Sequence, residues 1–263
     1  RRVGRPASTP PPRAWTTYTS PNRPAPPLEI CGLPLVILDT VREPQAPAFV
    51  FDLDGTLVDS VYQHVISWQV ALREIGLDLS VWRIHRRVGM SGGLFVRGVL
   101  REIGHDLTEE DVARLQDAHA AHYRQQVGQI RPLPGASELL AHLNRHGIRW
   151  AIATSGRRSY AEPMLDKLGV PGAALVTRDE VRWAKPDPDL FLAGADLLGA
   201  APSECVVVGD SVWDMLAARR ANSLGVGLLS GGYGQEELER AHAFRVYADP
   251  AELLAHVDEL GVR

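Results

Sequence analysis

The chain has 263 residues, of which 45% are hydrophobic and 23% charged, a composition typical of a globular protein with one large domain or two smaller ones. Its formal net charge of -4 provides no overall basic field, so we expect no nucleic-acid partner and no membrane-surface partner. No run of about 18 apolar residues occurs, which argues against a membrane span. The two cysteines, Cys31 and Cys205, lie in unlike surroundings, so we expect no disulfide framework and a cytoplasmic protein.

Residues 1–47 differ in composition from the rest of the chain. They contain 11 of the 19 prolines together with several arginines and little apolar periodicity. Such a segment cannot bury enough surface to offset the entropy lost on ordering, so we predict a disordered tail over 1–47. Its prolines argue against the amphipathic helix of a transit peptide. The apolar run Leu33–Asp39 leaves a short extra strand open.

From residue 48 on, short apolar runs alternate with amphipathic stretches, the pattern of a parallel sheet covered by helices on both faces. The sequence therefore predicts an α/β fold with a doubly wound, Rossmann-like core. The expected strands are 48–53, 148–154, 174–177, 205–210, 225–229 and 244–247. The expected helices that follow the later strands are 157–168, 187–199, 212–222, 235–242 and 250–258.

The first two expected strands are separated by more than 90 residues, far more than one crossover helix needs, and nearly all of them have helical periodicity. We expect the first helix of this insert to have Asp59 or Ser60 as its N-cap and to end at Gly76. Further helices are expected near 81–88, from 94 to 103, and from the capping-box sequence at 108–111 to 126. We thus predict a helical cap domain over 64–130 and a core domain made of 48–63 and 131–263.

Polar side chains follow three of the expected strands at the point where each strand ends. In open parallel sheets, ligands bind beyond the carboxyl ends of the strands at the switch point, so these side chains should converge. A lysine just before the helix that precedes the third of these strands should join them. The set is Asp52 and Asp54, Thr154 and Ser155, Asp210 and Asp214, and Lys185.

This set of residue types suits phosphoryl chemistry. Carboxylates this close repel one another and are costly to bury unless a cation compensates. A few carboxylate oxygens and several waters suit Mg²⁺, and a lysine and a hydroxyl are then the expected partners of a phosphoryl group. A free carboxylate can attack phosphorus while a second acid moves protons, and Asp52 and Asp54 could divide these two tasks.

Other functions of the same motifs have less support. A calcium EF-hand loop would need a third ligand, a glycine and a glutamate at three positions where the chain has Thr56, Leu57 and Gln63. The chain contains no P-loop, and the glycines of "GVGLLSGG" do not fit a dinucleotide fingerprint. Binding of NTP or NAD is therefore not predicted.

Four stretches together resemble the motifs of the haloacid dehalogenase superfamily of phosphohydrolases, in the branch with a helical cap inserted after the first strand. "DLDGT" is similar to its first motif, "AIATS" to its second, "KPDP" to its third and "VVVGDSVWD" to its fourth. The resemblance covers about 48–258 and is to the branch of phosphoglycolate phosphatases, sugar-phosphate phosphatases and beta-phosphoglucomutase. It implies a Mg²⁺-dependent phosphatase of small phosphorylated metabolites that works through an aspartyl phosphate, as a monomer or weak homodimer.

The resemblance also implies a role for each matching residue. Asp52 would be the nucleophile and, through its other oxygen, a ligand of Mg²⁺. Asp54 would be the general acid and base, with its backbone carbonyl on the metal. Asp210 would bind the metal directly. Asp214 would contact a metal-bound water or Lys185, and Lys185 would bridge the phosphate and the nucleophile. Phosphate or substrate binding is implied for Thr154, Ser155, Gly156 and His64.

Two alternatives stay open beside the phosphatase. A phosphosugar mutase of the beta-phosphoglucomutase kind has the same nucleophile and acid. Its cap loop typically reads Gly-Val-Ser-Arg where this chain has Gly-Met-Ser-Gly at 89–92, and it tends to have a small residue or Gly at the place of Asp214. A phosphate-binding or scaffold protein without catalysis is disfavoured by the complete set of acids and lysine.

The insert carries further polar residues whose roles are less defined by the sequence. Arg86 or Arg87 is a candidate contact for an anionic or hydroxylated substrate, although both also fit a solvated helix face. His119 and His122 have a spacing that could place them together on a helix, but no third ligand is near them in the sequence. We therefore predict no metal site at this pair.

Overall fold

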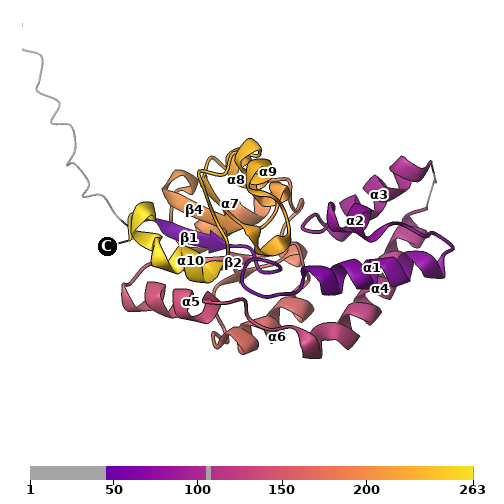
Figure 1. Cartoon of the computed structure of the whole chain (residues 1–263), viewed down its shortest axis with the longest axis horizontal. Helices are drawn as coiled ribbons and strands as arrows, with labels where there is room; N and C mark the ends of the chain where they lie inside the picture. The colour runs from indigo at the N-terminus through magenta and orange to yellow at the C-terminus, as the bar shows by residue number, and fades with distance from the viewer. Residues whose placement is uncertain (1–45, 105–107, 263) are drawn as a thin grey trace, which may run out of the picture. The chain divides into compact units, whose positions relative to one another are not determined.

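The computed structural model describes residues 46–104 and 108–262, and a six-stranded parallel sheet forms its centre (Figure 1). The strand order is β3-β2-β1-β4-β5-β6. The strands are β1 (Ala48–Phe51), β2 (Trp150–Ala153), β3 (Leu175–Val176), β4 (Cys205–Gly209), β5 (Leu224–Leu228) and β6 (Arg245–Tyr247). All six lie at or within one residue of the predicted ranges. The predicted tail and the possible strand at 33–39 lie outside the described residues.

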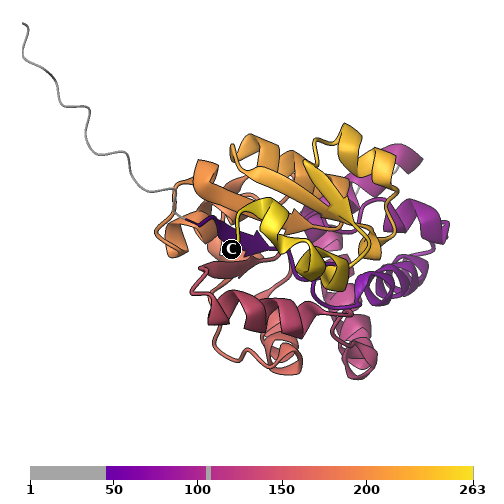
Figure 2. The same cartoon turned by 60° about the vertical axis from the view of Figure 1, so that its left-hand side comes forward.

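Strand β1 shows why this sheet is buried on both faces. Phe49 and Phe51 belong to one hydrophobic cluster, whereas Ala48 and Val50 belong to another, because successive side chains of a strand point to opposite faces. Helices α5 (Ala136–Arg145), α6 (Arg158–Leu168) and α10 (Pro250–Ala255) supply the first cluster, and α7 (Asp189–Leu197) and α8 (Val212–Arg220) supply the second (Figure 2). A further helix, α9 (Gln235–Arg240), packs near β5 and β6. The doubly wound fold class is confirmed.

Of the five α-helices that the structure describes between β1 and β2, the first four share a hydrophobic cluster of their own, whereas α5 packs on the sheet. The first four are α1 (Val61–Glu74), α2 (Val81–His85), α3 (Gly92–Ile103) and α4 (Glu109–Gln126), and they lie beyond one end of the sheet (Figure 1). Leu72 of α1, Ile84 of α2, Phe95 of α3 and Leu115 of α4 are among the buried members of this cluster. Since the cluster is separate from the two that flank the sheet, we refer to α1–α4 as the helical insert.

The ends of the inserted helices follow their sequence signals with one exception. The Thr108 hydroxyl accepts a hydrogen bond from Asp111 N at 3.2 Å, so the predicted capping box forms. Gly76 has φ +79°, the left-handed conformation that ends α1 at low steric cost. The prediction that Asp59 or Ser60 is the N-cap residue of α1 is confirmed at Ser60, but without the expected side-chain hydrogen bond. That bond does not form because the Ser60 hydroxyl is used elsewhere.

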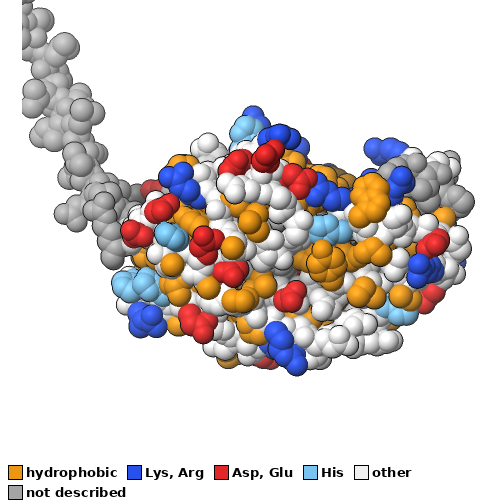
Figure 3. All heavy atoms as spheres, viewed as in Figure 1, with side chains coloured by type: hydrophobic (Ala, Val, Ile, Leu, Met, Phe, Trp, Pro, Cys, Tyr) orange, Lys and Arg blue, Asp and Glu red, His pale blue; other side chains and the backbone are white. Residues whose placement is uncertain are grey.

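The surface agrees with the charge balance of the sequence. In Figure 3, acidic and basic side chains are interspersed over the visible face rather than gathered by sign. Among the residues described by the structure, no helix combines the length and the apolar character needed to cross a membrane.

Candidate active site

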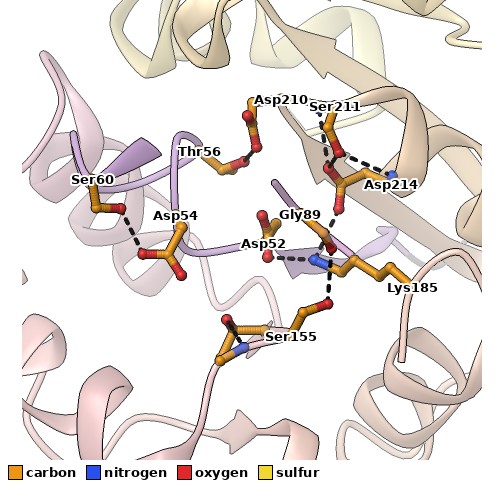
Figure 4. A network of polar contacts seen from close by, with 12 residues as sticks. Asp52, Asp54, Thr56, Ser60, Gly89, Ser155, Lys185, Asp210, Ser211 and Asp214 are labelled. Atoms are coloured by element: carbon orange, nitrogen blue, oxygen red, sulfur yellow. Dashed lines mark hydrogen bonds and ion pairs between the residues drawn. The ribbon is translucent and has the colours of Figure 1, made fainter. Parts of the chain in front are cut away.

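The carboxyl ends of β1, β2 and β4 bring the predicted polar residues to one place. Phe51, the last residue of β1, pairs with Ile152 on one side and Val208 on the other, so the residues that follow these three strands emerge side by side. Asp52 stays in register, since its backbone N–H donates to the Val208 carbonyl at 2.8 Å. The convergence expected at the switch point of a parallel sheet is therefore present (Figure 4).

Lys185 lies between two acids in the interior of the site. Its Nζ donates to Asp52 Oδ1 and lies 2.8 Å from Asp214 Oδ1, and none of the Lys185 side chain is exposed. The Asp214 oxygen has no aligned hydrogen-bond partner among the described residues, so its contact with the lysine is chiefly one of charge. Burial alone would lower the pKa of Lys185, but the two carboxylates outweigh it and raise the pKa. Lys185 is thus held as a cation where an unpaired charge would be very costly.

Three buried acids, Asp52, Asp210 and Asp214, could together hold a metal ion. One oxygen from each lies within 4.8 Å of the others. Burial raises the pKa of Asp52 to about 7, and the repulsion of neighbouring acids adds to this effect, although Lys185 opposes it. The pKa of Asp210 is also raised, first by burial and then by the negative charges of Asp214 and Asp52. Three acids facing one lysine leave negative charge in excess, which a divalent cation would offset. The all-oxygen donor set suits a hard cation.

Close backbone approach fixes the position of Asp210. A Cβ atom added to Gly231 would lie 1.7 Å from Asp210 Oδ2, and one added to Gly55 would lie 2.6 Å from the same oxygen. Gly55 also has φ +82°, which favours glycine. The Thr56 hydroxyl donates to Asp210 Oδ1 at 3.2 Å. The carboxylate therefore sits in a cradle of backbone with little freedom to turn.

Asp54 has different surroundings from Asp52, although only one residue separates them. The Ser60 hydroxyl donates to Asp54 Oδ1 at 2.5 Å (Figure 4). His64 Nε2 lies 3.2 Å from the same oxygen, and the Tyr123 hydroxyl lies 3.5 Å from it. Burial raises the pKa of Asp54, but the charge of His64 and the hydrogen bonds from His64 and Ser60 outweigh it, so the net pKa is lowered. The pKa values of the two neighbouring acids are thus shifted in opposite directions, because burial dominates at Asp52 and the contacts with His64 and Ser60 dominate at Asp54.

A second histidine supports the first and was not predicted from the sequence. His119 Nε2 lies 3.1 Å from His64 Nδ1, and the His119 ring stacks on Trp68 with the ring centroids 4.1 Å apart. Burial, and then the neighbouring His64, keeps the pKa of His119 well below its ordinary value. His122 instead contacts Glu74 at 2.7 Å, so the two histidines do not form a metal pair. Helical spacing alone could not identify the partner of His119, because that partner lies on another helix.

The turn after β2 contacts both the core and the helical insert. The Thr154 hydroxyl accepts a hydrogen bond from Gly156 N at 2.9 Å, and the Ser155 hydroxyl donates to the Gly89 carbonyl of the insert at 3.0 Å. A cavity of about 250 Å³ opens beside this turn. Its wall includes Asp52, Asp54, His64, Thr154, Ser155 and Gly156, whereas Lys185, Asp210 and Asp214 are not among the residues that line it.

The two arginines proposed as substrate contacts have different positions. Arg86 is paired with Glu237 of the core and lies over the Tyr233 ring at 4.2 Å, so it is not available to a substrate. Arg87 does line the cavity, and its Nη1 donates to the Arg83 carbonyl at 3.0 Å. Of the two predicted candidates, only Arg87 is therefore placed to meet a ligand.

A family model described as haloacid dehalogenase-like hydrolase matches residues 46–222. The chain belongs to this family. Hexitol phosphatase A of Escherichia coli (strain K12) is 38% identical to this hydrolase over 180 residues, which are 66% of this chain and 78% of that protein. Beta-phosphoglucomutase of Bacillus subtilis (strain 168) is 26% identical over 216 residues, 80% of this chain and 93% of that protein.

A solved structure is also similar to this chain. A crystal structure of a hydrolase from Pseudomonas syringae aligns with a TM-score of 0.80 and 52% sequence identity, and the alignment covers 81% of this chain and 98% of that one. The predicted superfamily, fold class and enzyme class are therefore confirmed. The catalytic role of each site residue stays a prediction.

Proposed function

We propose that this hydrolase is a Mg²⁺-dependent phosphatase of small phosphorylated metabolites, either sugar phosphates or phosphoglycolate-like acids. The observation that carries the proposal is the contrast between Asp52, paired with Lys185 beside two further acids, and Asp54, paired with Ser60 and His64. One carboxylate is placed for attack and the other for proton transfer. The cavity of about 250 Å³ next to them has room for a small metabolite and not for a macromolecule.

The reaction would proceed in two displacements at phosphorus. An oxygen of Asp52 forms a bond to phosphorus as the ester P–O bond breaks, and Asp54 gives its proton to the leaving oxygen. Asp54 then takes a proton from water, the water oxygen attacks phosphorus, and inorganic phosphate leaves with Asp52 restored. The lowered pKa of Asp54 suits this second task, since it favours the ionised base.

Other residues would hold the phosphoryl group and its charge. Thr154 and the backbone of Ser155 and Gly156 line the cavity next to Asp52, where they can donate hydrogen bonds to phosphoryl oxygens. Lys185 offers positive charge at the attacking carboxylate. Mg²⁺, held by Asp52 and Asp210 with Asp214 behind them, would neutralise charge on the acids and on the phosphoryl oxygens.

The helical insert would act as a cap that excludes bulk water. It supplies His64 to the cavity wall and reaches the turn after β2 through the contact between Ser155 and Gly89. We retain the predicted cap boundaries of 64–130 as part of this proposal, although α1 already begins at Val61. Closing a cap over a reacting phosphate would strengthen the electrostatic interactions inside the site.

An assay with para-nitrophenyl phosphate tests the proposal. We expect turnover with Mg²⁺, none with EDTA, and a loss of at least about 1,000-fold in Asp52→Asn, because the nucleophile is removed. Asp166→Asn is the matched control, since Asp166 is an exposed acid on α6 with the same change of charge. No turnover by the wild type, or full turnover by Asp52→Asn, would contradict the proposal.

A phosphosugar mutase is the second candidate, because one relative carries that name. Two features favour hydrolysis: the loop at 89–92 has no arginine, and Asp214 is a carboxylate next to Lys185 rather than a small residue. Incubation with beta-glucose 1-phosphate separates the two functions. Free phosphate supports the phosphatase, and glucose 6-phosphate without phosphate release supports the mutase.

A further inference from the structure

Two arginines line the cavity on the side of the turn after β2. Arg157 directly follows Gly156, and the backbone N–H of Arg178 donates to the Gly156 carbonyl at 3.1 Å, so both are anchored next to the turn expected to hold phosphate. Both residues form part of the cavity wall. Arg157 is exposed and Arg178 is partly buried, so solvent and ligands can reach them.

These two arginines differ from their neighbours because their side chains have no partner in the part of the chain that the structure describes. Arg158, next in sequence to Arg157, is paired with Glu162 and Glu180, and Arg86 is paired with Glu237. The side chains of Arg157 and Arg178, by contrast, make no hydrogen bond, ion pair or ring contact with any residue within 46–104 or 108–262. Of the three arginines that line the cavity, Arg87 donates from its Nη1 to the Arg83 carbonyl, whereas the side chains of Arg157 and Arg178 have no partner among the residues that the structure describes.

The transferred phosphate would not need these charges. Lys185 supplies positive charge at the attacking carboxylate, and a cation held by the three buried acids would add to it. One acid, Asp179, shares this part of the cavity wall, and its Oδ2 accepts a hydrogen bond from Arg158 N. Two positive charges against one negative charge leave an excess that an anionic group of the ligand would balance.

We propose that Arg157 and Arg178 bind a second anionic group of the substrate, so that the preferred substrates are phosphorylated metabolites with a carboxylate or a second phosphate beyond the carbon chain. This inference rests on the proposed phosphatase function and narrows its substrate class. Guanidinium groups bind either anion through paired hydrogen bonds. A neutral sugar phosphate of the same length would leave both groups unpaired in the cavity and bind less well.

Matched substrate pairs test this preference in the presence of Mg²⁺. Phosphoglycolate is compared with 2-hydroxyethyl phosphate, and 6-phosphogluconate with glucitol 6-phosphate, since each pair differs only in one carboxylate. Glucose 1,6-bisphosphate against glucose 6-phosphate tests a second phosphate. In at least one pair, we expect kcat/KM for the member with the additional carboxylate or phosphate to exceed that of its partner by about tenfold or more. The pairs that show the preference distinguish carboxylate from phosphate.

Variants then assign the preference to the two arginines. In the double variant Arg157→Gln/Arg178→Gln, the ratio of the two kcat/KM values within the preferred pair should fall to within about twofold of one, mainly because KM for the preferred substrate rises. The variants Arg157→Lys and Arg178→Lys should retain part of the ratio, because they keep the positive charge. Arg145→Gln is the control, because Arg145 is an exposed arginine on α5 away from the cavity. Its ratio should match the wild type.

The possible failures can be told apart. Hydrolysis of all pairs without preference, or a preference that survives in the double glutamine variant, would overturn this inference and leave the phosphatase function intact. An absence of hydrolysis of every compound by the wild type would overturn the phosphatase function and this inference with it. Thermal unfolding of each variant shows whether a loss of the ratio comes from a loss of fold.

Discussion

The two neighbouring acids of the first motif depend on different parts of the molecule. Asp52 is paired by Lys185, which also contacts Asp214, and all three belong to the segments around the sheet. Asp54 is contacted by His64 of α1 and Tyr123 of α4, both in the helical insert. The position of the proposed nucleophile is thus a property of the core, whereas the protonation of the proposed acid/base depends on where the insert lies. Substrate enclosure and proton transfer would therefore be coupled.

The largest effect is expected in the core, at Lys185. In Lys185→Met, two buried carboxylates lose their shared cation, and breaking a buried pair in this way costs about 3–5 kcal/mol of unfolding free energy. Urea unfolding at pH 7.5 without divalent cation measures this loss. Lys167→Met is the control, since Lys167 lies in the last turn of α6 outside the site. Equal losses in the two variants would show that the buried ion pairs contribute little.

The pH dependence of stability should identify Asp52 as the strained acid of the core. Without a cation, its pKa is raised from 3.8 to about 7, chiefly by burial. A carboxyl group with a raised pKa stabilises the folded state most below pH 3.8 and loses this contribution as pH rises to about 7. The unfolding free energy then falls by at most about 1.4 kcal/mol per pH unit for one such group. The contribution of Asp52 to the unfolding free energy in EDTA should therefore fall across this window, and the difference between the wild type and Asp52→Asn separates it from the contributions of Asp210 and His119.

Two changes should remove that contribution. Mg²⁺ favours the ionised carboxylate, and Asp52→Asn cannot titrate, so either should remove the Asp52 contribution to the slope between pH 4 and 7. Asp166→Asn should keep the slope of the wild type, since Asp166 is exposed. A slope in Asp52→Asn equal to that of the wild type would show that Asp52 is not responsible.

A smaller effect of opposite sign is expected at Asp54. Its pKa is lowered, so the stability that its contacts provide is present above pH 3.8 and is lost as pH falls through the lowered pKa. Ser60→Ala removes one donor and should cost about 1.5 kcal/mol at pH 7. The difference from the wild type should shrink below about pH 4 as the carboxylate is protonated.

Ser67→Ala is the matched control for this measurement. The Ser67 hydroxyl is also buried in α1, but it donates to the Gln63 carbonyl at 2.7 Å, a group that does not titrate. Its cost should be the same at every pH. If both serine variants gave pH-independent losses, the bond from Ser60 would not set the pKa of Asp54.

The sequence predicted the core of this site better than its surroundings for a physical reason. Strand positions follow from local apolar runs, and the residues after parallel strands must meet at one edge, so Asp52, Asp210 and their neighbours could be placed together without coordinates. The ranges of the helices in the insert were also predictable, because their periodicity and capping residues are local signals.

The contacts between the insert and the core could not be predicted in the same way. His119 meets His64 across two helices, and the hydroxyl of Ser60 turns from the helix end to Asp54. Arg86 was a candidate for substrate binding, but it is held by Glu237, about 150 residues later in the chain. Each of these partners depends on how the insert packs against the sheet, and helical periodicity in the sequence carries no information on that packing.

The smallest effect concerns the contact that joins the insert to α9. The guanidinium of Arg86 is paired with Glu237 and lies over Tyr233, and its Nη1 donates to Glu237 Oε2 at 3.1 Å. The side chains are 36% and 38% exposed, so a double-mutant cycle with Arg86→Gln and Glu237→Gln should give a coupling energy no larger than about 1 kcal/mol, falling with added salt.

The pair Arg240 and Glu236 provides the matched control, since it joins the same two residue types four positions apart within α9 and is almost fully exposed. Its coupling should be smaller, about 0.3–0.5 kcal/mol, and its loss should leave catalysis unchanged. Loss of the Arg86 pair should instead raise KM by about two- to threefold with little change in kcat, because a looser insert weakens enclosure of the substrate before it affects chemistry. Equal kinetics in the two double variants would show that this contact stabilises α9 and does not hold the insert over the site.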